Sequence, residues 1–157
     1  MRDYTCKVTL AAPPSRVYQA LMGAEGLAGR WTTTCDVSQQ VGGCSTFRFG
    51  PSYNVLKNVS LVPGQEVCWE CVQQYHHVPD QLTRADEWVG TQVVFQLSER
   101  PDGGTDLAFE HRGLRPAIEC YTICENRWNY YLGVSLKQYV ETGVGKPFDA
   151  ALGRLRP

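Results

Sequence analysis

The sequence predicts an α+β fold in which helices gather on one side of a curled antiparallel sheet. Three observations lead to this fold class. Short segments that alternate apolar and polar side chains fill most of the 157 residues, which is the pattern of half-buried strands. Turn sequences separate these segments, so neighbouring strands run antiparallel. Helical periodicity is confined to two short segments near the N-terminus and one long segment near the C-terminus. At this length we expect one domain over 1–157.

The N-terminal part predicts one strand and two short helices. Residues 3–10 alternate apolar and polar side chains and form the first strand. Pro13-Pro14 begins a helix, because a proline in the first helical turn loses no hydrogen bond, and Gly23 ends it. A second short helix follows and runs into Trp31.

Six further strands are expected, at 32–37, 43–49, 53–61, 67–75, 88–97 and 105–111. Tight-turn sequences at 62–65 and 101–104 make the strands on either side of each turn antiparallel neighbours. The loop at 77–86 is polar, contains Pro79, and is long enough to act as a lid or an edge cover.

The long C-terminal helix is predicted over about 117–141, after Pro116 and before a stop at Gly143. Its inward stripe is aromatic but carries polar atoms. The stripe contains Tyr121, Cys124, Trp128, Tyr131, Leu132, Ser135 and Tyr139. A sheet packed against this stripe encloses hydroxyls, a thiol and an imidazole, so we expect a lined pocket rather than a sealed apolar core.

Composition excludes several classes of protein. Lys and Arg number 15 against 16 Asp and Glu, which leaves no net field to attract nucleic acid or an acidic membrane surface. No apolar run approaches the roughly 20 residues that cross a bilayer, and the N-terminus has no signal-peptide pattern. We therefore expect a cytoplasmic protein that binds no nucleic acid and does not insert into membranes. A homodimer is left open.

The seven cysteines are predicted to be free thiols, because disulfide frameworks are rare inside cells. Cys68 and Cys71 have the spacing of a redox or zinc motif, but in a strand they face opposite sides of the sheet. Cys120 and Cys124 share a helix face, and His76-His77 lies near the loop. The sequence therefore leaves an assembled Cys/His site open in principle, but without a second close pair of ligands it predicts no metal. No phosphate-binding or nucleophile motif is present, and no cofactor is expected.

An ordered set of short segments resembles the SRPBCC (START-like, Bet v 1-like) superfamily. The segments are APPSRVYQAL at 12–21, GLAGRW at 26–31, VGG at 41–43, VPG at 62–64, EWVGT at 87–91, GT at 104–105, HRGL at 111–114, Trp128, and SLKQYVETG at 135–143. The set is most similar to the branch named after the C-terminal domain of the heat-shock-protein-90 ATPase activator. The resemblance implies a helix-grip fold, in which a curved antiparallel sheet wraps the C-terminal helix and leaves a hydrophobic cavity. One departure is Arg127, where family members often have Gly, and this bears on the width or direction of the cavity mouth.

Strand parity predicts which side chains face that cavity. On 88–97 alternate residues from Val89 to Leu97 point inward, and on 67–75 the inward set runs from Val67 to Tyr75 if no bulge intervenes. The predicted lining comprises Trp31, Phe47, Phe49, Trp69, Tyr75, Val93, Phe95, Phe109, His111, Cys124, Trp128 and Tyr131. Such a concave apolar surface with few polar groups is typical of a small-molecule pocket.

Two of these residues allow a structural and a functional interpretation. Trp128 is either a plain core residue or a pocket wall, because large aromatics dominate cores in general. His111 needs a partner on its apolar strand face, since leaving it unpaired costs on the order of 1–3 kcal/mol. That partner is a neighbour such as Tyr131, a backbone carbonyl, or a ligand, and a near-neutral pKa would suit proton transfer.

We therefore expect the chain to bind a small hydrophobic molecule, such as a lipid, a polyketide-like compound or another apolar metabolite. One alternative is a polyketide cyclase or aromatase that uses His111, Tyr131 or Tyr75 as acid or base. The other is a chaperone-linked interaction module that works through its outer surface, although the family name alone transfers no function.

Overall fold

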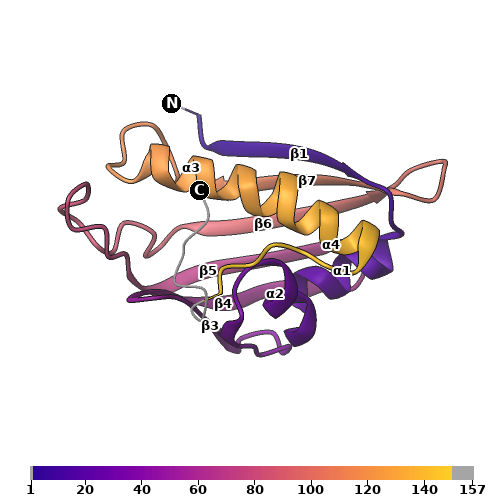
Figure 1. Ribbon diagram of the computed structural model, residues 1–157, viewed down its shortest axis with the longest axis horizontal. Coiled ribbons are helices and arrows are strands. Elements are labelled where there is room, and N and C mark those ends of the chain that lie inside the picture. The colour runs from indigo at the N-terminus through magenta and orange to yellow at the C-terminus, as the bar shows by residue number, and fades with distance from the viewer. Residues whose placement is uncertain (1, 150–157) are drawn as a thin grey trace.

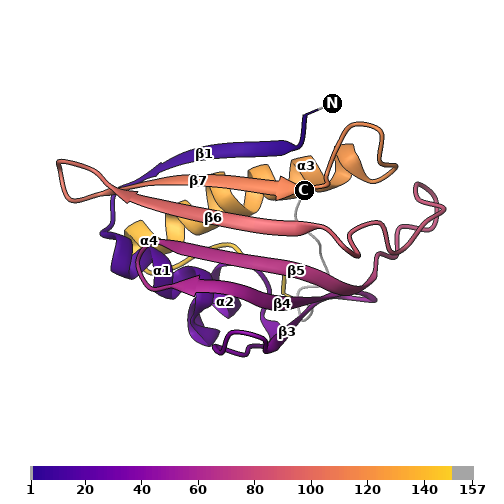
Figure 2. The same ribbon diagram turned by 180° about the vertical axis from the view of Figure 1, so that it is seen from behind.

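A seven-stranded antiparallel sheet curves around one long helix, as the sequence and the resemblance predict. The computed structural model describes residues 2–149, so the predicted domain over 1–157 extends past the described residues at both ends. The strand order is β1-β7-β6-β5-β4-β3-β2. Figure 1 shows the C-terminal helix lying across the sheet, and Figure 2 shows that no helix within residues 2–149 covers the opposite face. No helix in the described part of the chain is long and apolar enough to cross a membrane.

The strands begin and end close to the predicted positions, with one exception. They are β1 (Tyr4–Leu10), β2 (Thr34–Asp36), β3 (Cys44–Phe49), β4 (Ser52–Val62), β5 (Glu66–Tyr75), β6 (Gln92–Glu99) and β7 (Thr105–Arg112). The prediction that a strand begins at 88 is wrong, because the backbone turns there: Thr91 N–H donates to Trp88 O at 2.8 Å. Val89, predicted to point inward, is 47% exposed. Farther along β6, Val93 and Phe95 are fully buried, as their parity predicts.

A bulge in β5 changes which side chains face inward near the end of that strand. Leu56 pairs with Cys71, but its neighbour Val55 pairs with Gln73, so Val72 is an extra residue. Parity reverses after a one-residue bulge. Tyr75, predicted to point inward, is consequently 40% exposed, and the next residue in the chain, His76, is buried instead.

The helices form one layer. The two short ones are α1 (Pro14–Met22) and α2 (Ala24–Arg30), as predicted, and the C-terminal helix is continuous through α3 (Tyr121–Tyr130), a π-helical stretch η1 (Tyr131–Leu136) and α4 (Lys137–Thr142). It begins four residues later than predicted. The backbone N–H groups of Glu119 and Cys120 donate instead to the Glu87 carboxylate, at 3.1 and 3.0 Å. Gly143, with φ of 91°, ends the helix as predicted.

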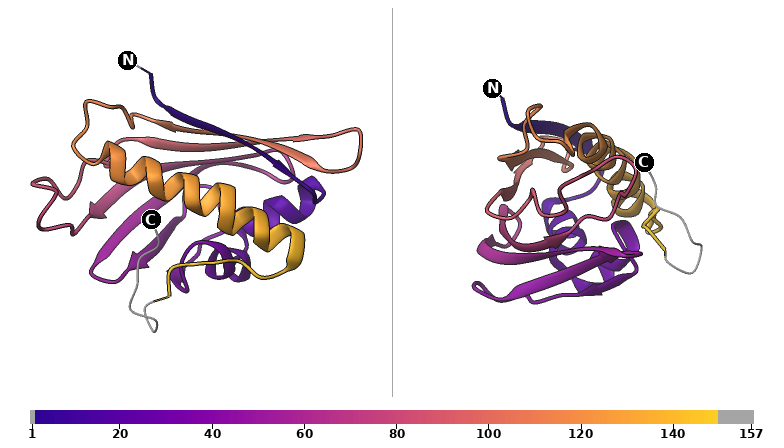
Figure 3. Two further views of the ribbon diagram at one scale, coloured as in Figure 1. Left: turned by 45° about the horizontal axis from the view of Figure 1, so that its top comes forward. Right: turned by 90° about the vertical axis from the view of Figure 1, so that its left-hand side faces the viewer.

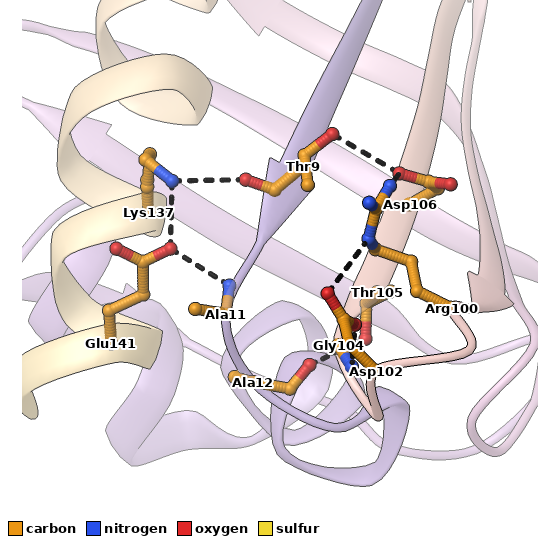
Figure 4. Close-up of polar contacts among 10 residues, drawn as sticks. All are labelled: Thr9, Ala11, Ala12, Arg100, Asp102, Gly104, Thr105, Asp106, Lys137 and Glu141. Carbon is orange, nitrogen blue, oxygen red and sulfur yellow. Dashed lines mark hydrogen bonds and ion pairs between the residues drawn. The ribbon is translucent and has the colours of Figure 1, made fainter.

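Polar contacts fix the far end of the long helix to the sheet (Figure 4). Lys137 Nζ donates to the carbonyl of Thr9 at 3.0 Å and pairs with Glu141 at 2.8 Å. The Glu141 carboxylate in turn accepts the N–H of Ala11 at 2.8 Å. Figure 3 shows the result: the sheet curls around the helix along its length. The opposite end, where α3 begins, lies beside the loop between β5 and β6 and is where the pocket opens.

Candidate functional site

A cavity of about 50 Å³ lies between the sheet and the C-terminal helix, near the start of that helix. Its walls come from the end of α2, from β3, β4, the end of β5 and the loop before β6, and from α3 and η1. The lining residues are Trp31, Phe49, Ser52, Tyr53, Asn54, Gln74, Tyr75, His76, Trp88, Cys124, Arg127, Trp128 and Tyr131. The surface is mainly aromatic, with a few polar groups at fixed positions, and it is open to solvent on one side.

Six of the twelve residues proposed from the sequence line this cavity. They are Trp31, Phe49, Tyr75, Cys124, Trp128 and Tyr131. The other six, Phe47, Trp69, Val93, Phe95, Phe109 and His111, are buried behind it in the core. The lining proposed from the sequence lacks the other seven lining residues, which are Ser52, Tyr53, Asn54, Gln74, His76, Trp88 and Arg127. Trp88 lies in a turn where the sequence predicts the start of a strand, and His76 faces inward only because of the bulge at Val72.

All four tryptophans of the chain form one continuous stack. Trp69 and Trp31 lie 6.0 Å apart with nearly parallel rings, at 4°. Trp31 lies 5.5 Å from Trp128, and Trp128 lies 5.7 Å from Trp88 at 9°. The stack therefore runs from the core into the pocket, where its last three rings form part of the wall. Flat apolar rings are the natural partners of such a wall.

His111 is fully buried, and both of its ring nitrogens have partners inside the protein. Trp128 Nε1 donates to His111 Nδ1 at 3.1 Å, so this nitrogen carries the lone pair. Thr91 Oγ1 donates its own proton to the carbonyl of Trp88 at 2.6 Å and therefore accepts the Nε2–H of His111 at 2.8 Å. Burial lowers the pKa of His111 to about 3, against a weak opposing effect of Asp3. The imidazole is thus neutral, does not line the cavity, and is held by neighbours other than those the sequence suggested.

Asn54 lines the cavity and carries a buried polar atom without a partner. Its side chain is 5% exposed, and its Oδ1 has no hydrogen-bond partner among the described residues. The neighbouring polar groups are in use: Gln74 Oε1 accepts the N–H of Trp88 at 2.9 Å, and Ser52 Oγ accepts the N–H of His77 at 2.9 Å. A buried amide oxygen without a donor is costly, so a molecule that offers one donor here is favoured.

Three potential metal ligands meet beside the cavity, near the start of α3. His76, Cys120 and Cys124 are all buried, and their ligand atoms lie within 4.8 Å of one another. The two sulfurs are 3.1 Å apart and share a hydrogen bond. Hydrogen bonds from Cys120 and from Trp88 lower the pKa of the Cys124 thiol, whereas the pKa of Cys120 is raised by the same thiol pair and by burial. Burial, reinforced by the charge of Arg127, lowers the pKa of His76 to about 4.

The remaining cysteines do not contribute to this group. All seven are free thiols, as predicted. Cys71 is fully buried on the inner side of β5, whereas Cys68 is on the other face of the strand, near Arg112. This alternation confirms that the two residues of the motif point to opposite sides of the sheet.

Solved structures with this architecture come from bacteria of several groups. The solution structure of the Aha1 dimer from Colwellia psychrerythraea is 29% identical, with a TM-score of 0.75, over 92% of this chain and all of that one. A crystal structure of a Mesorhizobium loti protein is 19% identical, with a TM-score of 0.72, over 89% and 97% of the two chains. DynU16, a protein of the dynemicin biosynthetic locus, is 16% identical, with a TM-score of 0.69, over 92% of this chain and 49% of its own. The last two likenesses show the fold alone.

A family model described as activator of Hsp90 ATPase homolog 1-like protein matches residues 11–141. Comparison with curated proteins finds no match. Within the matched region lie both the strands that form the pocket and the helix that covers it. Because the match spans most of the chain, this protein belongs to the family of activator of Hsp90 ATPase homolog 1-like proteins.

Proposed function

We propose that this chain binds a small apolar molecule, about one aromatic ring in size and carrying one hydrogen-bond donor. The observation that carries the proposal is a cavity walled by stacked tryptophans and lined by Asn54, whose buried Oδ1 has no partner among the described residues. The rings of Trp31, Trp88 and Trp128 provide apolar contact, and the amide oxygen provides orientation. The helix-grip fold of the family is compatible with this use, since it leaves space between the sheet and the helix.

The volume of the cavity narrows the range of ligands. One water needs on the order of 10–15 Å³ of such a volume, so the cavity of about 50 Å³ holds about four waters. A ring with one substituent suits this space better than a lipid chain or an extended polyketide does. A larger ligand requires the pocket to widen, and Tyr75, which is 40% exposed, is the most exposed of the lining residues.

No observation favours the two alternatives over binding. A cyclase needs an acid or base at the cavity wall. Of the three residues suggested for that role, His111 has both nitrogens engaged in the core, and Tyr75 and Tyr131 line the cavity. An interaction module needs a broad exposed apolar patch. The large exposed apolar side chains among the described residues are seven valines and one tyrosine: two lie on β4, two on β5, one in η1 and three in separate loops.

Two further proposals concern the setting in which the protein works. The seven free thiols suit a reducing compartment, and we retain the cytoplasm as the proposed location. The Colwellia relative is a dimer, which supports a homodimer of this chain as well.

The test titrates the full chain with phenol or with benzene. Binding of each probe is measured from changes in amide chemical shifts in nuclear magnetic resonance spectra. Both rings should shift the signals of Trp31, Trp88 and Trp128, and phenol should bind more tightly because its hydroxyl donates to Asn54. The variant Asn54→Leu keeps the shape of the side chain but removes the oxygen. It should abolish the preference for phenol while leaving benzene binding unchanged.

A matched control is Asn126→Leu, which makes the same change on an exposed position of α3. This variant should keep the preference for phenol. The proposal is refuted if neither ring shifts the pocket signals at concentrations up to the solubility of the probes. It is equally refuted if the preference for phenol survives Asn54→Leu.

A further inference from the structure

Three side chains from two distant parts of the sequence converge at the end of the pocket. His76 follows β5, whereas Cys120 and Cys124 lie at the start of α3. Their ligand atoms are all within 4.8 Å of one another. The three residues are 9%, 1% and 2% exposed, respectively. This convergence is independent of the aromatic wall and involves a different chemistry.

We propose that His76, Cys120 and Cys124 form a binding site for Zn(II), with a fourth position open toward the pocket. Two sulfurs and one imidazole nitrogen make a donor set that binds zinc in preference to harder cations such as magnesium or calcium. Three protein ligands with one position left open are the arrangement of zinc sites that bind an exchangeable ligand. His76 and Cys124 line the pocket, which places the open position on that side and provides a path of entry.

The geometry needs only small adjustments to accept the ion. Zinc bonds of about 2.0–2.3 Å in a tetrahedral site put ligand atoms about 3.5–3.8 Å apart. The sulfurs of Cys120 and Cys124 are 3.1 Å apart, and the largest separation within the group is under 4.8 Å. Movements of about 1 Å or less, within the reach of side-chain rotation, bring all three atoms into coordination distance. The spacing of two cysteines with three residues between them is within the range found in zinc sites.

Neighbouring groups already hold the ligands in place. Arg127 Nη1 donates to His76 Nε2 at 3.0 Å, so this nitrogen carries a lone pair, and the imidazole is neutral. An ion that takes this lone pair displaces the guanidinium toward the pocket, which Arg127 also lines. Trp88 Nε1 donates to the sulfur of Cys124 at 3.3 Å, and the Glu87 carboxylate binds the backbone of Cys120 at 3.0 Å. A dication with two thiolates is neutral as a group, and Arg127 and Glu87 add charges of opposite sign, so the site is balanced.

Zinc at this position joins the end of β5 to the start of the long helix. These elements are 44 positions apart in sequence, from His76 to Cys120, and no strand pairing connects them. The ion thus closes one end of the pocket, at the opposite end of the helix from the Lys137 contacts. Because zinc would bind this site in the folded chain and not in the unfolded chain, it should raise the melting temperature.

The experiment uses the full chain, prepared without metal and under reducing conditions, and titrates it with Co²⁺ and then Zn²⁺. One equivalent of Co²⁺ should produce the visible bands of a tetrahedral site and a sulfur-to-metal charge-transfer band in the near ultraviolet. Zn²⁺ should remove these bands by displacement. Zinc at about 100 times its dissociation constant should raise the melting temperature by about 5–10 °C.

Two pairs of variants identify the ligands. His76→Gln and Cys124→Ser should each weaken zinc binding by more than about 100-fold, the upper range for loss of a supporting contact alone. Their matched controls, His77→Gln and Cys68→Ser, change the same residue types outside the site and should leave the affinity unchanged. If Cys124→Ser fails to fold, as judged by circular dichroism, His76→Gln carries the test.

The proposal is overturned if Co²⁺ gives no charge-transfer band, or if the band persists in the folded His76→Gln variant with undiminished affinity. It is also overturned if the two controls lose the band to the same extent as the ligand variants. Because the probe is the metal alone, failure here leaves the phenol experiment unaffected, and failure of that experiment leaves the zinc site standing.

Discussion

Replacing His111 with Gln should remove a large part of the loss of stability that acid causes in this protein. In the folded chain burial lowers the pKa of His111 to about 3, whereas in the unfolded chain the imidazole has its ordinary value of 6.5. Between these values the unfolded chain binds one proton that the folded chain does not. Stability contributed by the neutral imidazole is therefore complete above pH 6.5 and falls as the pH falls toward 3.

The magnitude follows from the two pKa values. Each pH unit in this window costs about 1.4 kcal/mol, so between about pH 7 and about pH 4.5 the wild type should lose about 2.5 kcal/mol through His111. Gln does not titrate and can still donate and accept, so at neutral pH the variant should lose only about 1 kcal/mol. Burial also lowers the pKa of His76 to about 4, so this residue adds its own loss of stability in acid. Both proteins contain His76, so its contribution cancels when their losses are compared.

The assay is urea unfolding of both proteins at the two pH values, with His77→Gln as a control at an exposed position. The control should follow the wild type. Equal losses of stability in the wild type and in His111→Gln would show that the imidazole is not held neutral in the core. It would then be available for proton transfer, and the cyclase alternative would gain support.

Three further predictions concern the free energy of unfolding, measured with urea. Thr91→Val removes the hydroxyl that accepts the Nε2–H of His111 and should cost about 1–3 kcal/mol, whereas a loss below 0.5 kcal/mol would contradict the assigned hydrogen bonds. Gly26→Ala should cost about 2 kcal/mol or more, because its Cβ would lie 2.6 Å from backbone atoms of α1. Gly133→Ala should instead gain about 0.4–1 kcal/mol, because its Cβ meets nothing within 4 Å. A change of the same sign in both variants would be inconsistent with this packing. Glu87→Gln removes the charge that accepts two N–H groups at the start of α3 and should cost about 1 kcal/mol at neutral pH, and no cost would contradict that role.

The fold could be predicted from the sequence because its two periodicities are strong and local. The alternation in β7 and the helical stripe through Trp128 can each be recognised from residues that are close together in the sequence. Glycines at turns also predict the ends of elements accurately: Gly143 adopts a positive φ and ends the helix where expected. The start of that helix was misplaced because Glu87, more than 30 positions away, takes the N–H groups that another helical turn would have used.

The site was predictable only in part, for a physical reason. Which face a strand residue occupies depends on every residue before it in the strand, so one extra residue reverses the remainder. The bulge at Val72 does this: His76 becomes buried, while Tyr75 lines the cavity only as an exposed residue. No local signal in β5 marks the bulge. Likewise, the partners of His111 come from a turn and a helix whose approach depends on the packing of the whole domain.

The stack of four indoles has a consequence for how this protein absorbs and emits light. Rings separated by 5.5 to 6.0 Å are close enough for their excited states to mix, so the tryptophans respond to light as one extended chromophore. Circular dichroism in the indole bands should therefore show a paired positive and negative signal that collapses when any inner ring is replaced. Excitation that begins on Trp69, in the core, reaches Trp88 at the pocket. A halogenated ring bound at the pocket would then quench the fluorescence of a tryptophan that it does not touch. The changes in emission caused by single tryptophan replacements would not add up to the emission of the wild-type protein.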